Sequence, residues 1–177
     1  GIPSLVATRG RPGAPKSERF KKMLKGPASL ERNPTWLCVV AGLLVDRGGR
    51  WLMHRRPSGK AHGGQWEFPG GKVEEGEVPE AALARELAEE LGVGIEPDNL
   101  EPLVFASDGP ISTGKPITLL LYRVTRWSGT PQALEGGAID WMLPGEIARL
   151  DKPPLDIALF AKASALLGAA PDGAALD

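Results

Sequence analysis

The apolar residues of this chain are grouped in short runs whose patterns predict strands. Residues 35–45 form a continuous apolar run rich in valine and leucine, which is typical of a strand buried on both faces. The turn sequence DRGGR follows, and residues 51–55 return as a second strand. Residues 102–107, 116–127 and 137–143 predict further strands, and no parallel strand–helix–strand rhythm is visible among them. We therefore expect strands to dominate the fold.

Helical patterns occupy two longer segments. Residues 79–91 begin with a proline, which is tolerated at the first helical position, and end before Gly92, a typical residue after a helix. The apolar stripe that faces the core is expected at Leu83, Ala84, Leu87, Ala88 and Leu91. Residues 154–167 predict an amphipathic closing helix, and residues 144–150 predict one or two helical turns. Strands with helices packed on them indicate an α/β (α+β) fold.

The composition is that of an ordinary globular protein. Of 177 residues, 42% are hydrophobic and 24% are charged, and the net charge of −1 creates no global field that would attract nucleic acid or membranes. A single cysteine, Cys38, excludes an internal disulfide framework and fits a reducing compartment. No apolar run approaches the roughly 18 residues that span a bilayer. We expect a cytoplasmic protein without a membrane partner or a stable nucleic-acid partner.

The two ends of the chain differ from its middle. Residues 1–33 contain eight lysines and arginines and two glutamates, and 8 − 2 gives a net charge of +6. We expect a flexible basic N-terminal extension, with a cleavable targeting segment or an arm that contacts polyanions as alternatives. Residues 169–177 are expected to form a frayed C-terminal tail, which leaves residues 34–168 as the folded domain.

Three glutamates crowd one side of the helix predicted over residues 79–91. Glu86, Glu89 and Glu90 fall within an arc of about 100°, and like charges at these spacings each cost about 0.2–0.5 kcal/mol. Arg85 can offset only part of this repulsion. One interpretation is a solvated acidic face, although the lysines that normally alternate with acids there are missing. The other is a site for Mg²⁺, which prefers carboxylate oxygens and bridges them to substrate phosphates.

The region around these glutamates resembles the signature of the Nudix hydrolase family. The matching positions are Gly71, Glu77, Arg85, Glu86, Leu87, Glu89, Glu90, Gly92 and Val93. The segments WEFPGGK, RRP, RWSGTPQALEGG and PPLD are similar to those of MutT-type nucleoside triphosphate pyrophosphohydrolases. The resemblance implies the Nudix fold, in which a mixed β-sheet is sandwiched between helices. It also implies Mg²⁺-dependent hydrolysis of a (deoxy)nucleoside triphosphate to the monophosphate and pyrophosphate.

The resemblance assigns expected roles to individual residues. The expected ligands of Mg²⁺, which Mn²⁺ can replace, are the Gly70 carbonyl, Glu86, Glu89, Glu90 and Glu135. The expected catalytic residues are Arg85, Glu86, Glu90 and Glu135. Arg85 would hold Glu86 in position by a charge-assisted hydrogen bond, and any of the three catalytic glutamates could accept the proton of the attacking water. For Glu135, the alternative is an exposed loop residue.

The expected substrate-binding residues are Arg56, Phe68, Lys72 and Asp156. Arg56 and Lys72 are candidates for phosphate contact, with a solvated role as the alternative for Arg56. Asp156 occupies the place where the MutT subgroup often carries a base-reading asparagine, and the alternative is a cap of the last helix. An ionised Asp156 suits guanine, whereas a protonated one suits cytosine.

The aromatic and histidine residues near these positions are less specific. Phe68, or else Trp66, could stack on the base or could belong to the core. His54 and His62 show no ligand spacing and are expected to be incidental.

The leading functional expectation is cleansing of the nucleotide pool by hydrolysis of 8-oxo-dGTP, with the small-molecule nucleotide as the partner. Alternatives are a pyrimidine enzyme acting on CTP or 5-methyl-dCTP, another substrate linked through a nucleoside diphosphate, and a non-catalytic nucleotide-binding module. The intact signature, which we call the box (residues 71–93), favours an enzyme, because binding alone does not need Arg85 together with Glu86, Glu89 and Glu90. The oligomeric state is not predicted.

Overall fold

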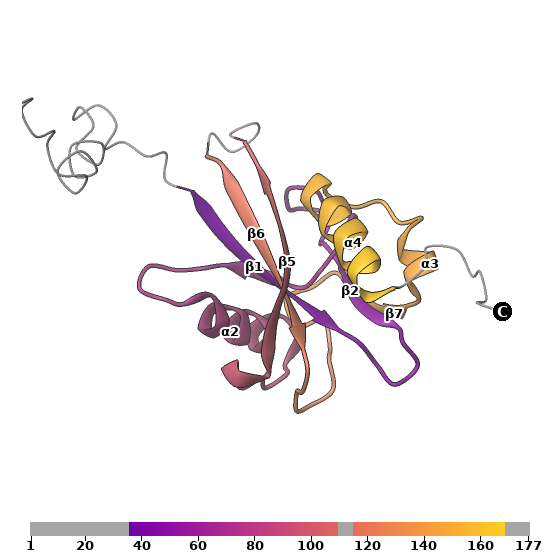
Figure 1. Cartoon of the computed structure of the whole chain (residues 1–177), viewed down its shortest axis with the longest axis horizontal. Helices are drawn as coiled ribbons and strands as arrows, with labels where there is room; N and C mark the ends of the chain where they lie inside the picture. Colours follow the sequence, from indigo (N-terminus) through magenta and orange to yellow (C-terminus); the bar gives the residue numbers. More distant parts are fainter. Residues whose placement is uncertain (1–35, 110–114, 169–177) are drawn as a thin grey trace, which may run out of the picture. The chain divides into compact units, whose positions relative to one another are not determined.

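A computed structural model describes residues 36–109 and 115–168 of the chain (Figure 1). The expected basic extension, residues 1–33, and the expected tail, residues 169–177, lie outside the described residues. Within the described ranges, none of the helices is both long enough and apolar enough to cross a membrane.

The strands form two sheets. One sheet has the order β4 (Gly70–Lys72), β1 (Leu37–Leu44), β6 (Ile117–Val124) and β5 (Leu100–Asp108). The other has the order β3 (Trp66–Glu67), β2 (Trp51–Arg55) and β7 (Ala138–Met142). Strands β1 and β6 pair in parallel, whereas the other neighbours are antiparallel. The four-stranded sheet is therefore mixed, as the family resemblance implies.

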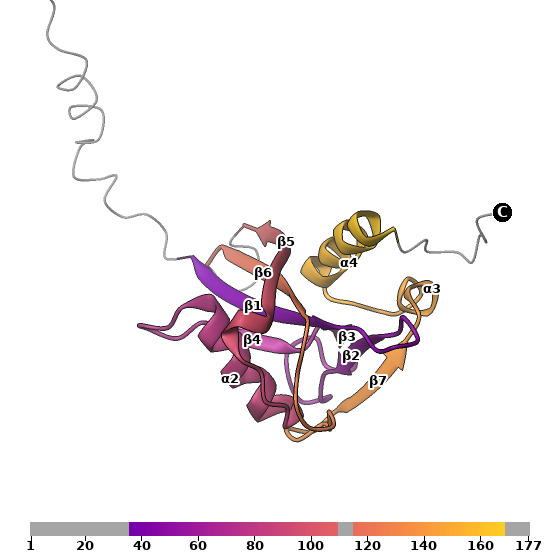
Figure 2. The ribbon, with the colours of Figure 1, turned by 60° about the horizontal axis from the view of Figure 1, so that its bottom comes forward.

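Helices cover both faces of this mixed sheet. Helix α2 (Pro79–Leu91) lies on one side and α4 (Pro154–Leu167) on the other (Figure 2). The alternation of side chains along β1 explains the arrangement, because successive residues of a strand point to opposite faces. Val40 and Leu44 pack in the core with Leu87 of α2, whereas Ala41 and Leu43 pack in the core with α4. The predicted sandwich of a sheet between helices is confirmed.

The predicted elements agree well with the observed ones. The bounds predicted for β2, α2 and α4 match the structure, and the other long strands differ by a few residues at their ends. A short helix, α3 (Pro144–Ile147), stands where helical turns were predicted, and a 3-10 turn, η2 (Pro97–Asn99), was not predicted. Sequence patterns also missed β3 and β4, which are too short to show alternation. The parallel pairing of β1 with β6 was not predicted, because these two strands are not consecutive in the chain.

Helix α2 begins and ends as its sequence predicts, but its buried face is rotated slightly. Gly92 has a φ of 69°, a left-handed conformation that suits glycine, and its N–H donates to the Ala88 carbonyl at 3.0 Å. The predicted core position Ala88 is wrong, because its side chain is exposed, and Ala82 is buried instead. Ala84 is only half-buried. The rotation turns Glu90 towards the interior, where it is 8% exposed.

Candidate active site

A cleft of about 690 Å³ brings most of the predicted site residues together. Segments of β1, β2, β4, α2, α4 and the connecting loops line it. Among the predicted site residues, those that line the cleft are Arg56, Phe68, Gly70, Lys72, Glu86, Glu90, Glu135 and Asp156. Arg85 and Glu89 lie beside it. Polyphosphate-binding candidates and base-binding candidates therefore share one continuous space.

Arg85 is the centre of an ion-pair network on α2. Its guanidinium donates to Glu77 at 2.8 and 2.9 Å, to Glu86 at 2.9 Å and to Glu89 at 3.3 Å. It also donates to the Lys72 carbonyl at 3.2 Å. The Arg85 guanidinium, helped by the Glu74 N–H, lowers the pKa of Glu77 to about 2. Arg85 thus joins the loop that precedes α2, through Glu77, to the acidic side of the helix. This is the geometry expected for holding Glu86 in position.

Glu90 points into the interior and has a partner for each oxygen. The Gly70 N–H donates to its Oε2 at 3.0 Å, and the ring of His54 lies 2.9 Å from its Oε1. Glu89 differs, because its side chain is 53% exposed and contacts Arg85. The predicted trio of glutamates is therefore divided. Glu86 and Glu90 line the cleft, whereas Glu89 lies at its edge.

Gly70 and Gly71, where the box begins, each occupy a place in which a side chain would not fit. Gly70 has a φ of 153°, and a side-chain carbon there would overlap the Val40 carbonyl oxygen. A side-chain carbon on Gly71 would overlap the carboxylate of Glu86. Glycine is thus required at residue 70 by strand β1, and at residue 71 by the predicted metal ligand Glu86.

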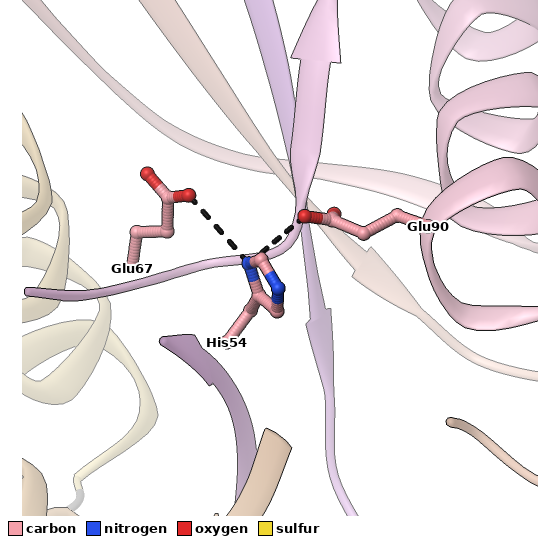
Figure 3. Close-up of side chains that lie close together, drawn as sticks. All are labelled: His54, Glu67 and Glu90. Carbon is pink, nitrogen blue, oxygen red and sulfur yellow. Dashed lines mark ion pairs between the residues drawn. The ribbon is translucent and has the colours of Figure 1, made fainter. Parts of the chain in front are cut away.

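His54 is buried, and the expectation that it is incidental is wrong. It is 3% exposed, and its Nδ1 lies 2.9 Å from Glu90 Oε1 and 3.6 Å from Glu67 Oε1 (Figure 3). Its Nε2 lies 3.2 Å from the Gly136 carbonyl oxygen. Burial disfavours the charged ring, but the Glu67 and Glu90 carboxylates outweigh burial and raise the pKa of His54 to about 10.

Sequence reasoning missed both His54 and Glu67. They are directly opposite each other across the pair of β2 and β3. A strand at residues 66–67 would have placed the two side chains on one face, but two residues carry no alternation signal. His62, in contrast, is exposed and has a φ of 59°.

The cations at the cleft are only partly available to a phosphate chain. Arg56 donates to Glu67 at 2.6 Å and to the Ala61 carbonyl at 2.7 Å, so its guanidinium is held by the protein while its side chain stays 29% exposed. Lys72 is exposed at the cleft. Lys60 lies 3.9 Å from Glu135, and both side chains are more than half exposed, at 57% and 53%.

Another part of the cleft is built around Asp156. This residue is 5% exposed, and its Oδ1 accepts the Phe68 N–H at 2.9 Å. Burial raises the pKa of Asp156 to about 7, against the lowering effect of that N–H. Helix α4 has no side-chain cap at its start, so the capping interpretation of Asp156 is wrong.

The aromatic residues near Asp156 belong to the core. Phe68 is 3% exposed, and its ring centroid lies 6.3 Å from that of Trp51. Trp66 is half-buried and packs against the same core. This burial favours the core interpretation of Phe68, which contributes a wall of the cleft.

The donor set of the cleft fits a divalent cation. The potential ligand atoms of His54, Glu67 and Glu90 lie within 4.8 Å of one another. The Glu86 carboxylate lines the same space, and the missing side chain of Gly71 makes room for it. Carboxylate oxygens are the ligands that hard cations prefer. The described part of the chain thus contains a carboxylate and histidine cluster that could hold a metal ion.

Comparison with known proteins identifies relatives over this same region. The family model for the NUDIX domain matches residues 37–162. CTP pyrophosphohydrolase of Escherichia coli (strain K12) is 36% identical over 132 residues, covering 75% of this chain and 95% of that protein. Putative 8-oxo-dGTP diphosphatase 2 of Mycobacterium tuberculosis (strain ATCC 25618 / H37Rv) is 40% identical over 118 residues, covering 67% and 81%.

Solved structures give the same result. The solution structure of the E. coli ORF135 protein has a TM-score of 0.68 and 34% sequence identity, covering 82% of this chain and 99% of that one. The MutT Nudix hydrolase of Burkholderia pseudomallei has a TM-score of 0.63 at 24% identity, covering 72% and 98%, and supports the fold. With its box, its fold and these relatives, the chain belongs to the Nudix family and is a MutT-type hydrolase acting on phosphoric anhydride bonds.

Proposed function

We propose that this protein hydrolyses a (deoxy)nucleoside triphosphate to the monophosphate and pyrophosphate in a Mg²⁺-dependent reaction. One observation carries the proposal: the box carboxylates Glu86 and Glu90 share a single cleft with the buried Asp156. A triphosphate at one end and a base at the other would fill such a space. A non-catalytic module would not need the ion-pair network of Arg85 around the acidic helix.

The metal would be held by Glu86, Glu90 and the Gly70 carbonyl, with Glu135 and the exposed Glu89 completing the set. Bound Mg²⁺ neutralises phosphate charge and lowers the pKa of a coordinated water. The protein residues orient these ligands. Arg85 holds Glu86 at 2.9 Å, and the Gly70 N–H holds Glu90 at 3.0 Å. A carboxylate of the cleft, from Glu86, Glu90 or Glu135, accepts the proton of the attacking water.

The phosphate chain would contact the exposed cation Lys72, and Arg56 is the second candidate for this contact. Arg56 donates to Glu67 at 2.6 Å, which holds its guanidinium at the wall of the cleft. Phosphoryl transfer depends on positioning and on stabilisation of charge, and both would depend on these cations and on the metal.

The base would meet Asp156 beside the wall formed by Phe68. An ionised Asp156 accepts hydrogen bonds from guanine N1–H and its exocyclic amine, which favours 8-oxo-dGTP as the substrate. A protonated Asp156 donates to cytosine N3, which favours CTP or 5-methyl-dCTP as the second candidate. A pKa of about 7 supports both forms near neutral pH. Relatives of similar identity are named for both substrate types.

A panel of 8-oxo-dGTP, dGTP, CTP and 5-methyl-dCTP, assayed with Mg²⁺ for pyrophosphate and for phosphate, tests the proposal. We expect pyrophosphate release, and a loss of about 10²- to 10⁴-fold in kcat for Glu90→Gln with little change in unfolding temperature. Glu96→Gln, which changes an exposed acid, is the matched control. Full activity of Glu90→Gln would refute the role of Glu90, and no hydrolysis by the wild type would refute the function.

A further inference from the structure

We propose that His54 is a positioning residue that holds Glu90 and the loop of Glu135 in a fixed relation across the cleft. This inference rests on the function proposed above, because its consequence concerns the proposed metal ligands. His54 is 3% exposed, and it lies on β2 between segments that are distant in sequence. A buried polar side chain in such a place requires partners.

The partners of His54 come from three separate segments. Its Nδ1 lies between the carboxylates of Glu90 on α2, at 2.9 Å, and Glu67 on β3, at 3.6 Å (Figure 3). Nδ1 is in close contact with Glu90 but forms no hydrogen bond of regular geometry with either carboxylate. On the opposite side of the ring, Nε2 lies 3.2 Å from the Gly136 carbonyl oxygen. Each ring nitrogen therefore faces oxygen acceptors, and the ring connects them.

The contact with Gly136 adds an anchor to the loop that carries Glu135. Gly136 and Gly137 follow Glu135 with φ values of 88° and 79°, and neither has a side chain that could anchor the loop. Backbone bonds tie the preceding residues to the end of α2, since the Leu134 N–H donates to the Glu90 carbonyl at 2.9 Å. His54 adds a side-chain contact immediately after Glu135. It thereby links the carboxylate of Glu90 to the backbone beside Glu135.

Groups that orient metal ligands typically change metal affinity or activity by 10- to 100-fold when they are removed. His54 has this position for Glu90, whose other oxygen accepts the Gly70 N–H at 3.0 Å. Glu67 is already paired with Arg56 at 2.6 Å, so it serves as the second wall around the ring. Direct coordination of the metal by Nδ1 is a different arrangement, and the experiment separates the two.

The experiment compares three variants of the full chain with the wild type. His54→Leu removes the contacts of both ring nitrogens, His54→Gln retains an amide that can satisfy one of them, and Glu96→Gln changes an exposed acid outside the lining of the cleft as a control. We measure kcat and KM for the triphosphate at saturating Mg²⁺, and the Kd of Mn²⁺ by electron paramagnetic resonance.

We expect His54→Leu to lower kcat or Mn²⁺ affinity by about 10- to 100-fold, His54→Gln to lose less, and Glu96→Gln to match the wild type. The loss should be smaller when Glu135 is already Gln, because His54 acts partly through that loop. Thermal unfolding reports whether His54→Leu folds, and His54→Gln preserves the test if it does not.

Two outcomes would overturn the inference. One is a His54→Leu protein with wild-type kcat and Mn²⁺ affinity. The other is nitrogen-14 coupling to bound Mn²⁺ in pulsed resonance spectra that disappears in His54→Gln, since it would make His54 a direct ligand. Either result leaves the proposed function intact if the wild type releases pyrophosphate. A wild type without hydrolysis, in contrast, refutes the function itself.

Discussion

Replacing Asp156 with asparagine should stabilise the protein in a strongly pH-dependent way. The substitution keeps an oxygen that can accept the Phe68 N–H, at 2.9 Å in the wild type, and removes a buried titratable charge. Burial is the main cause that raises the pKa of this carboxyl from 3.8 to about 7. Because the folded-state pKa lies above the unfolded one, the carboxyl favours folding below pH 4. That contribution is lost as the pH rises through 7.

The difference between these two pKa values corresponds to about 4 kcal/mol. The Asp156→Asn variant should therefore exceed the wild type in free energy of unfolding by about 4 kcal/mol at pH 8 and by about 1.5 kcal/mol at pH 5. Urea unfolding at pH 5, 6, 7 and 8, followed by tryptophan fluorescence, measures this difference. Trp51 is 3% exposed and packs against Phe68, so its emission reports on this part of the core.

The exposed Asp98→Asn is the matched control and should change stability by less than about 0.5 kcal/mol. A difference for Asp156→Asn that stays constant with pH, or a variant less stable than the wild type at pH 8, would refute the reasoning. The same pKa predicts that the wild-type preference for 8-oxo-dGTP over CTP, expressed as a ratio of kcat/KM, rises between pH 6 and 8.5. In Asp156→Asn that ratio should no longer follow pH.

The remaining predictions concern the box. Gly70→Ala should destabilise the fold by about 1–3 kcal/mol, because the φ of 153° and the Val40 carbonyl leave no room for a side chain. Gly71→Ala should retain most stability but weaken Mn²⁺ binding by about tenfold or more, since its new carbon displaces the Glu86 carboxylate. Urea unfolding measures the stability of each variant, and Mn²⁺ titration measures its metal affinity. If the two variants lost stability and Mn²⁺ affinity to the same extent, the different roles assigned to Gly70 and Gly71 would be contradicted. Arg85→Lys should lower kcat by about 10- to 100-fold, because lysine cannot replace the paired contacts to Glu77. An unchanged kcat in Arg85→Lys would count against the positioning role of Arg85.

The sequence predicts the elements with strong periodic or boundary signals. Helix α2 is bounded by Pro79 and Gly92, which act locally, and its limits agree with the structure. Strand β1 is recognisable because both of its faces are buried. Strands β3 and β4 are defined by their partners rather than by their own pattern, and so they were missed.

The same distinction applies to the site. Glu86 and Glu90 are predictable because their spacing on a helix is fixed by local geometry, and the structure places both at the cleft. The environment of His54 is not predictable in this way. Its neighbours Glu67 and Glu90 meet it only after β2, β3 and α2 have packed together. The raised pKa of Asp156 likewise depends on tertiary burial.

Strand β1 cannot complete its sheet until β6 exists, because Leu37 pairs with Ile117, and 117 − 37 separates these partners by 80 residues. Contacts so far apart slow folding, since the entropy of closing the intervening loop is lost before the contact forms. On the ribosome, the acidic helix emerges while one edge of β1 is still unpaired. An unpaired edge is a template for association with other chains. The interval between synthesis of β1 and synthesis of β6 is therefore when a nascent chain is most exposed to aggregation.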